Sequence, residues 1–224
     1  MTAPRPQAAP ETSPETSLTP AGETSPAAPR TDPAAGRHAL LVLAHPRTDS
    51  LTAQLAHRSR ARLEAAGFTV DLLDLHAEGF DPRMSPQDEP DWADQDKRYS
   101  AEVRAQMRRI DAADVIVAVF PLWWFGLPAI LKGWIDRVWN HGFAYGRSSP
   151  RLQGKRMLWI PLAAYPQDRF EELGWAGLVD RLLREGISAY CGIEDASVHF
   201  VHDSLTAGEK GLDAADDALD AFLG

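Results

Sequence analysis

The sequence predicts an α/β fold, in which helices cover both faces of a five-stranded parallel sheet of order 2-1-3-4-5. Short apolar runs rich in β-branched residues alternate with segments of helical spacing, which is the pattern of a doubly wound sheet. The run after Asp114 is apolar and uncharged, as expected of a central strand that is buried on both faces. A polar loop after the first strand and an aromatic loop after the third suit the switch point of this strand order.

The first half of the chain supplies two units of a strand followed by a helix. The strand His38–Ala44 precedes a helix at Leu51–Ala66, which has leucines at helical spacing and stops at a glycine. The strand Phe68–Leu75 leads into residues 76–96, whose acidic residues and X-Pro pairs predict a long loop that could cover an active site. A helix over residues 98–112 follows, with its apolar side chains on one stripe.

The second half continues the alternation. The central strand stops at Pro121, and a helix at Leu127–Trp139 follows the aromatic loop. The apolar faces of this helix are broader than one sheet contact needs, which suggests a subunit interface and hence a homodimer. The remaining elements are expected to be a strand at Lys155–Ala163, a helix at 169–185, a strand at Ala196–His202 and a helix at Ala207–Leu223.

Composition bounds the class of protein. The chain of 224 residues has room for one domain with a sizeable core, and its net charge of −9 argues against nucleic acid as a partner. The only cysteine, Cys191, has apolar neighbours that indicate a buried structural thiol, and it excludes an intrachain disulfide. No apolar run approaches about 18 residues, so we expect no membrane insertion and a cytoplasmic location.

The first 36 residues differ from the rest of the chain. Eight of the 17 prolines precede residue 34, in a segment of Ala, Ser, Thr and Glu. Such a segment has little to bury, so residues 1–36 are predicted to be a disordered tail and residues 37–224 a single folded domain. The tail is compatible with a linker, a solubilising extension or a start codon upstream of the true one.

The loop between the first strand and its helix is a candidate anion site. The unpaired N–H groups and partial positive charge of a helix start at Ser50, Leu51 and Thr52 can hold a phosphate, with Arg47 nearby. The alternative is plain helix capping, which happens at many helices that bind nothing. The loop lacks a GxGxxG fingerprint, which argues against a Rossmann dinucleotide domain.

The loop after the central strand carries Trp123, Trp124 and Phe125, followed by Gly126. Aromatic rings and backbone N–H groups at the carboxyl end of a strand suit a flat heteroaromatic ligand such as a flavin. The alternative is that these rings fill core or a subunit interface. We do not expect His199 and His202 to bind a metal ion together, because the two side chains would lie on opposite faces of a strand.

Three stretches resemble one known family. The run PLWWFGLPAILKGWIDRV, the segment HGFAYG at 141–146 and the loop LVLAHPRTDSLT are similar to those of the NAD(P)H:quinone oxidoreductase (DT-diaphorase) family, which includes the bacterial potassium-efflux ancillary reductases. The resemblance covers residues 39–150 well and the remainder in outline. It implies a flavodoxin-like fold, a bound flavin and hydride transfer from NADH or NADPH to a quinone or similar flat acceptor. FAD is the cofactor of the quinone reductases and smaller relatives use FMN; the two share the ring and first phosphate, so the loops do not choose between them, and FAD is favoured slightly.

The same resemblance implies the site residues. For Tyr145, the alternative is an ordinary half-buried loop tyrosine. The residues implied to bind the cofactor are His45, Ser50, Leu51, Thr52, Pro121, Leu122, Trp123, Trp124 and Phe125, and those implied to line the substrate pocket are Ala144, Tyr145 and Gly146.

The chain departs from the family pattern after the fourth strand. The family carries a Thr-Thr-Gly-Gly run there, with a Tyr and a His soon after that assist hydride transfer. This chain has Leu162, Ala163, Ala164 and Tyr165, and no histidine between 142 and 198. Tyr165 could compensate, but the catalytic residue is unknown from the sequence.

Two other functions fit the same residues. HGFAYG followed by Gly154 and Lys155 resembles the ancillary proteins, so a regulatory subunit of a potassium efflux system is one alternative. A one-electron carrier of the flavodoxin type is the other. It is disfavoured because the aromatic loop and Tyr145 resemble a hydride-transfer site. Neither a flavin-dependent reductase nor a one-electron flavin carrier needs a catalytic triad or a metal cluster, because the flavin supplies the chemistry.

Overall fold

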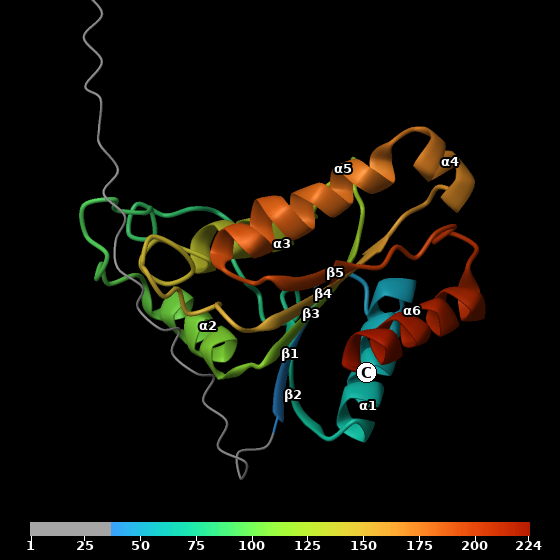
Figure 1. Ribbon diagram of the computed structural model, residues 1–224, viewed down its shortest axis with the longest axis horizontal. Coiled ribbons are helices and arrows are strands. Elements are labelled where there is room, and N and C mark those ends of the chain that lie inside the picture. Colours follow the sequence, from blue (N-terminus) through green and yellow to red (C-terminus); the bar gives the residue numbers. More distant parts are fainter. Residues whose placement is uncertain (1–36) are drawn as a thin grey trace, which may run out of the picture. The chain divides into compact units, whose positions relative to one another are not determined.

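The computed structural model describes residues 37–224, so the tail predicted for residues 1–36 lies outside the described residues. Strands and helices alternate along this part of the chain (Figure 1). The strands are β1 (Arg37–Leu43), β2 (Phe68–Asp74), β3 (Val115–Pro121), β4 (Arg156–Leu162) and β5 (Asp195–Val198). The helices are α1 (Leu51–Ala65), α2 (Ala101–Ala112), α3 (Ala129–Val138), α4 (Gln167–Glu172), α5 (Trp175–Arg181) and α6 (Gly208–Leu223), with a π-helical segment η1 (Leu182–Ser188) and a 3-10 turn η2 (Ala189–Cys191) after α5.

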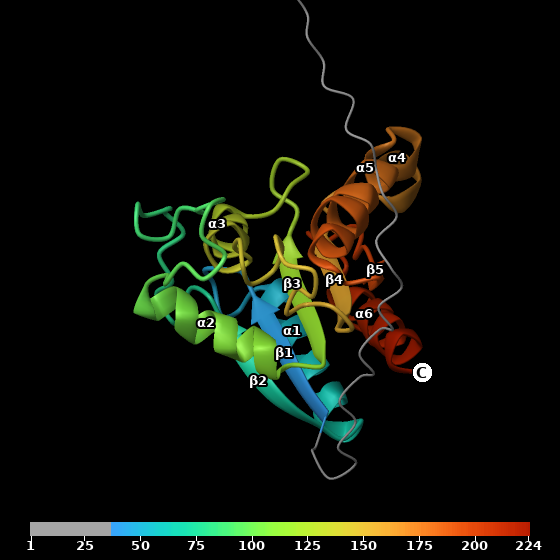
Figure 2. The same ribbon diagram turned by 60° about the vertical axis from the view of Figure 1, so that its left-hand side comes forward.

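The five strands form one parallel sheet of order β2-β1-β3-β4-β5, which confirms the predicted order. Helices α1 and α6 cover one face, and α2, α3 and α5 cover the other (Figure 2). Along β3, Val117 and Val119 point to the α1 and α6 side, while Ile116 and Phe120 point to the opposite core. The central strand is therefore buried on both faces, as its uninterrupted apolar sequence predicts.

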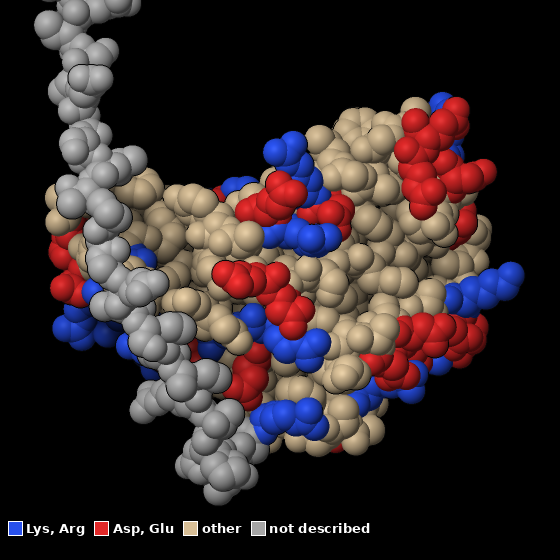
Figure 3. Space-filling view, in the orientation of Figure 1, with Lys and Arg blue, Asp and Glu red and all other residues tan. Residues whose placement is uncertain are grey.

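Ion pairs join α1 to α6 along their exposed sides. Arg58 on α1 contacts Asp213 and Asp216 on α6, each with a nitrogen–oxygen distance of 2.6 Å. Figure 3 shows a row of acidic side chains over α6 with basic side chains beside it. The Arg58–Asp213 pair is largely exposed and contributes about 0–1 kcal/mol, whereas Asp216 is buried together with the apolar face of α6, which dominates the attachment of this helix.

The predicted helix at 169–185 is wrong, because the chain breaks there. Helix α4 ends before Gly174, whose φ of 76° is left-handed, and α5 begins after it. After α5 the chain continues as the π-helical segment η1 and not as an α-helix. Ser188 supports this π-helical segment by donating its hydroxyl to the carbonyl of Leu183 (2.8 Å), while Trp159 Nε1 donates to Ser188 Oγ (3.0 Å).

Two other predicted boundaries shift. The last strand ends at Val198 instead of His202, although backbone hydrogen bonds from the amides of His199 and Val201 continue the contact with β4. Helix α3 begins at Ala129 instead of Leu127, because Pro128 adopts an extended conformation with ψ of 146°. Both differences affect the ends of elements and leave the strand order unchanged.

The acidic segment between β2 and α2 is a loop, as its prolines indicate, and a buried ion pair fixes it to α3. Arg137 is 4% exposed and donates to Asp88 (2.8 Å), which is fully buried, and to Glu102 (2.7 Å). Burial alone would raise the pKa of Asp88, but hydrogen bonds from Arg137 and Ser100 outweigh it and hold that pKa below its usual value. The carboxylate is thus ionised and fully paired in the folded protein.

Candidate functional site

Three loops meet at the carboxyl edge of the sheet. The ring of His45, after β1, lies 6.0 Å from that of Trp123, after β3, between ring centroids. Phe125 in the same β3 loop lies 5.8 Å from the ring of Tyr165, which follows β4. Residues from three neighbouring strands therefore converge where ligands bind in open α/β sheets.

The loop after β1 presents unpaired amides. Ser50 caps α1, since its hydroxyl oxygen accepts a hydrogen bond from the amide of Ala53 (3.2 Å). The amides of Leu51 and Thr52 have no acceptor within residues 37–224, and they lie at the positive end of a helix. Such a helix start can bind an anion such as a phosphate. Ser50 therefore does cap the helix, as the alternative interpretation expects, but the amides of Leu51 and Thr52 remain available to a ligand.

Histidine and arginine side chains flank this helix start. The Nδ1 atom of His45 accepts a hydrogen bond from the amide of Arg47 (3.1 Å), which orders the loop. Burial lowers the pKa of His45, so its imidazole is neutral near pH 7. The Arg47 guanidinium forms an exposed ion pair with Asp49 (2.9 Å), which leaves it accessible to an anion that approaches from solvent.

The loop after β3 is a tight turn with unusual backbone angles. The amide of Gly126 donates to the carbonyl of Trp123 (3.1 Å), and the two residues between them, Trp124 and Phe125, have φ of 54° and 58°. Bulky residues rarely adopt this left-handed conformation, which costs about 1–2 kcal/mol per residue relative to the right-handed one. Strain of this kind is often found at ligand-binding positions, where surrounding structure maintains it.

The turn residues divide into two groups. Trp124 is 99% exposed and Trp123 47% exposed, whereas Phe125 stacks on Trp175 of α5 with ring centroids 4.1 Å apart and planes 12° apart. The amides of Trp124 and Phe125 have no acceptor within the described residues. The turn thus offers a free indole and two free donors, while Phe125 anchors it to the protein.

Pro121 and Leu122 fix the start of this turn. Pro121 is the last residue of β3 and pairs with Leu162 of β4. The amide of Leu122 donates to the Leu162 carbonyl (2.8 Å), so both residues are held at the sheet edge. All nine residues predicted to bind the cofactor therefore lie in, or directly beside, two loops that the His45–Trp123 contact brings together.

The predicted substrate residues lie elsewhere within the chain. Ala144, Tyr145 and Gly146 follow α3, whose ten residues separate them from the turn by about 15 Å. The ring of Tyr145 lies 5.8 Å from that of Trp92 and 5.5 Å from that of Tyr190, between centroids. One chain does not bring these residues to the loops after β1 and β3, so their role in substrate binding stays a prediction.

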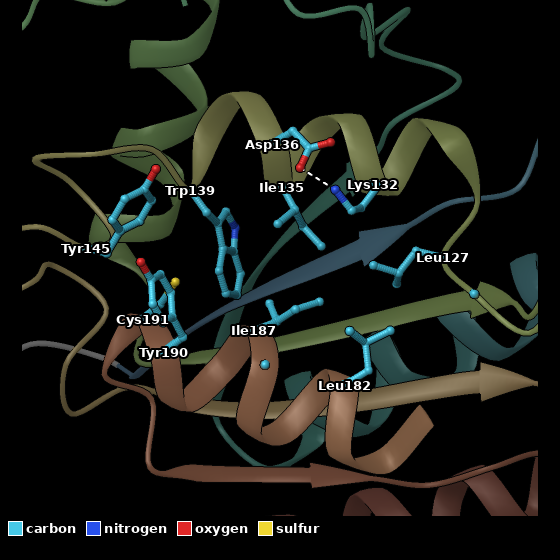
Figure 4. A pocket seen from close by; sticks show the side chains of 12 residues that line it. Leu127, Lys132, Ile135, Asp136, Trp139, Tyr145, Leu182, Ile187, Tyr190 and Cys191 are labelled. Atoms are coloured by element: carbon cyan, nitrogen blue, oxygen red, sulfur yellow. Dashed lines mark hydrogen bonds and ion pairs between the residues drawn. The ribbon is translucent and has the colours of Figure 1, made fainter. Parts of the chain in front are cut away.

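A groove lies beside the turn, which the sequence did not reveal. It has a volume of about 620 Å³ and runs between α3 and η1 (Figure 4). No sequence pattern indicates this groove, because its walls come from helices about 50 residues apart and one wall depends on η1. A smaller cavity of about 140 Å³ at the start of α6 is lined by His202, Asp203 and Lys210, among others.

Neither cavity has the composition of a metal site. Within residues 37–224, no group of three or more His, Cys, Asp and Glu side chains is arranged to hold a metal ion. His202 packs instead against Phe170 and Phe200, with ring centroids 5.4 and 5.8 Å away. Cys191 is buried, and burial raises the pKa of its thiol to about 12.

Comparison with known proteins agrees with this arrangement. An Escherichia coli (strain K12) protein named "Uncharacterized NAD(P)H oxidoreductase YcaK" is 42% identical over 175 residues, which cover 78% of this chain and 88% of that protein. The NAD(P)H dehydrogenase [quinone] 1 of Cavia porcellus is 35% identical over 127 residues, which cover 50% of this chain and 46% of the relative.

A solved structure and a family profile extend the agreement over almost all described residues. The structure of a putative quinone reductase from Klebsiella pneumoniae is 27% identical, with a TM-score of 0.73, and the match covers 83% of this chain and 84% of the other. The family profile described as "Flavodoxin-like fold" matches residues 37–223. The chain therefore belongs to the family of proteins with a flavodoxin-like fold, as the three sequence stretches implied.

Proposed function

We propose that the protein is a flavin-dependent oxidoreductase that reduces a quinone or similar flat acceptor with NAD(P)H. In balance, NAD(P)H, one proton and the quinone give NAD(P)⁺ and the hydroquinone. The observation that carries the proposal is the pairing of free helix-start amides with an exposed indole turn at one sheet edge. The names of the E. coli, C. porcellus and K. pneumoniae proteins support it.

The residues present fit a flavin. The free amides of Leu51 and Thr52, beside Ser50, suit its phosphate, and the free amides and indole of Trp124 suit a flat polar ring. His45, Pro121, Leu122, Trp123 and Phe125 shape the space between the two loops. When bound, the flavin would accept and donate the hydride, while these residues would orient it and exclude water.

We propose FAD as the flavin, with FMN as the alternative. The small cavity with His202 and Lys210 adjoins the proposed phosphate site, since a Cβ built at Gly211 would lie 3.7 Å from Leu51 Cδ2. A second phosphate needs such space and a positive charge, whereas FMN carries no second phosphate. Mass spectrometry of the released flavin distinguishes the two, and Lys210→Ala is expected to weaken retention of FAD only.

Tyr165 is our candidate for assisting the proton transfer that accompanies hydride transfer. It is partly exposed at the carboxyl edge, where its carbonyl oxygen accepts a hydrogen bond from the amide of Asp203 (3.2 Å). It occupies the region where the family's Thr-Thr-Gly-Gly run is absent. Substitution by Phe keeps the ring and removes the hydroxyl, so a lower kcat at unchanged flavin content is the expected result.

A homodimer is also part of the proposal, for a different reason than the sequence suggested. The apolar residues of α3 are already covered within the chain, so its broad apolar faces do not require a partner. The separation of about 15 Å between Tyr145 and the aromatic turn does favour one, because a second copy could bring its Tyr145 to the turn. Light scattering that gives the mass of one chain at micromolar concentration would refute the homodimer.

Nothing in the described helices favours insertion into a membrane. No helix within residues 37–224 is long and apolar enough to span a bilayer. We propose a cytoplasmic location, which is supported by the single cysteine being a free, buried thiol.

The test of the proposed function is the flavin content of Trp124→Ala. The purified protein is expected to be yellow and to oxidise NAD(P)H when a quinone is added. Loss of the exposed indole should weaken flavin binding by about two- to tenfold, because aromatic contacts of this kind contribute about 0.5–1.5 kcal/mol. Trp92→Ala is the matched control, since Trp92 is also exposed but lies on another loop. A colourless protein that takes up neither FAD nor FMN would refute the proposal.

A further inference from the structure

Three aromatic side chains that follow β4 surround Phe125 in the turn after β3. The ring of Trp175, at the start of α5, stacks on that of Phe125, with centroids 4.1 Å apart and planes 12° apart. Phe170 of α4 lies 6.3 Å from Phe125 with planes 27° apart, and Tyr165 lies 5.8 Å away, between ring centroids. Phe170 is buried, and Phe125 and Trp175 are partly buried against the same core. The turn is therefore attached to the segment that follows the next strand of the sheet.

The break at Gly174, which separates α4 from α5, makes this aromatic cluster possible (Figure 1). On one continuous helix, Phe170 and Trp175 would point in directions roughly 140° apart, because successive residues are rotated by about 100°. Gly174 instead adopts a left-handed φ of 76°, and α5 begins immediately after it. Both rings then lie against Phe125. Glycine suits this position because of its backbone, since a Cβ built there would meet nothing within 4 Å.

The stack on Trp175 accounts for the conformation of the turn. Trp124 and Phe125 have left-handed backbone angles, which are unfavourable for bulky residues and persist only where the surrounding structure maintains them. The hydrogen bond from the Gly126 amide to the Trp123 carbonyl closes the turn without engaging either of these side chains. Trp124 is 99% exposed, so its side chain packs against little that could maintain the angles. Phe125 and its ring partners are the contacts that can.

We propose that Trp175 is a positioning residue of the flavin site. Through Phe125, it holds the turn in the conformation that presents the free amides of Trp124 and Phe125 before any flavin binds. The inference rests on the proposed function and adds to it a residue of α5, a helix that carries none of the predicted site residues. A site whose donors are already in place loses less conformational freedom on binding, so its affinity is higher. Loss of Trp175 should weaken flavin binding without removing a group that we assign to the flavin.

The first experiment follows the turn in the flavin-free, full-length protein. The Gly126 amide exchanges its hydrogen when its bond to the Trp123 carbonyl opens, so hydrogen exchange read by NMR measures how firmly the turn is held. Trp175→Leu keeps an apolar side chain but removes the ring, and an aromatic pair changes an equilibrium constant by about two- to tenfold. We expect Gly126 to exchange faster by that factor. Unchanged exchange would refute the inference.

The second measurement is the dissociation constant of FMN and of FAD, obtained by titrating the same flavin-free variants. Trp175→Leu should raise this constant by about two- to tenfold. Trp175→Phe retains a ring that can stack, so it should stay closer to the native protein than Trp175→Leu in both flavin affinity and Gly126 exchange.

Val179→Ala is the control for a loosened helix, because it removes buried apolar surface from α5 but no ring from the aromatic cluster. It should lower Tm and leave flavin affinity and Gly126 exchange unchanged. If Val179→Ala weakened flavin binding as much as Trp175→Leu, the effect would be one of general destabilisation, and Trp175 would have no positioning role.

Gly174 offers a test that leaves every ring of the cluster in place. Asn tolerates a left-handed backbone and β-branched Val does not, while either side chain would project into open space. Gly174→Val should therefore displace Trp175 from Phe125 and weaken flavin binding, and Gly174→Asn should retain it. Native flavin affinity in both variants would contradict the inference.

Failure of the proposed function would look different. A native protein that binds neither FMN nor FAD would refute the flavin site, and Gly126 exchange in Trp175→Leu would still show whether Trp175 holds the turn. Flavin that binds with native affinity to Trp175→Leu, in protein that reduces quinones, would refute the inference and leave the proposed function intact.

Discussion

Two irregular segments of the molecule differ in whether their polar groups have hydrogen-bond partners. In the acidic loop between β2 and α2, the carboxylate of Asp88 is fully buried and accepts hydrogen bonds from Arg137, Ser100 and Ser85. In the turn after β3, backbone amides lack acceptors within the described residues, and Trp124 is almost fully exposed. The Asp88 carboxylate is satisfied without a ligand, although Arg137 Nε has no acceptor among residues 37–224, whereas the turn offers several groups that a ligand would use.

The difference shows how structural and binding residues can be separated on physical grounds. A buried charge must be paired, and a network whose members are all paired fixes the shape of the chain. Free donors and left-handed backbone angles contribute nothing to stability, so their presence at a sheet edge calls for another role. Changes in the loop should therefore alter stability, and changes in the turn should alter flavin binding.

The largest expected effect belongs to the buried pair. Arg137→Leu would leave Asp88 buried and ionised without its partner, which costs about 3–5 kcal/mol of unfolding free energy. Chemical denaturation of the flavin-free protein measures this loss. Lys132→Leu is the control, because it also removes a basic side chain from α3 but breaks only an exposed pair, with an effect of about 0–1 kcal/mol. A loss below about 1 kcal/mol for Arg137→Leu would contradict the structural role of the loop.

The pH dependence of stability gives a smaller effect at the same pair. The folded-state pKa of Asp88 lies below its unfolded value, so its contribution is present above the unfolded pKa of about 3.9 and is lost as the pH falls through the folded pKa. Asp88→Asn removes one titrating group, and the acid slope of unfolding free energy should decrease by up to about 1.4 kcal/mol per pH unit. An unchanged slope would show that Asp88 is not the carboxylate concerned.

Much of the fold was predictable because the sheet is buried on both faces. Runs such as Val115–Phe120 cannot form an exposed element, and the alternation with helices then determines the parallel order. The break at Gly174 and the π-helical segment η1 were not predictable in this way. They depend on contacts such as that of Trp159 with Ser188, which joins residues 29 positions apart.

The candidate site was predictable to a similar degree. Loops that follow neighbouring strands must meet at one edge, so His45 and Trp123 could be expected to lie together. The sequence could not show that Phe125 stacks on Trp175, or that a groove joins the turn to the region of Tyr145. Each of these depends on how helices distant in sequence lie against one another.

The smallest expected effect is that of Trp124→Asn. This change should distinguish binding residues from structural residues most clearly, because it should raise the stability of the flavin-free protein and weaken flavin binding. Trp124 has a φ of 54°, which Asn tolerates better than Trp, so Trp124→Asn should stabilise the flavin-free protein by about 1 kcal/mol. For a domain of this size, that corresponds to a rise in Tm of about 2–4 °C. The same change removes the exposed indole and should weaken flavin binding by about two- to tenfold. Trp92→Asn, whose backbone is not left-handed, should change neither quantity. If Trp124→Asn lowered Tm, the turn would be stabilised by its own side chain, and its strain could not be attributed to a ligand.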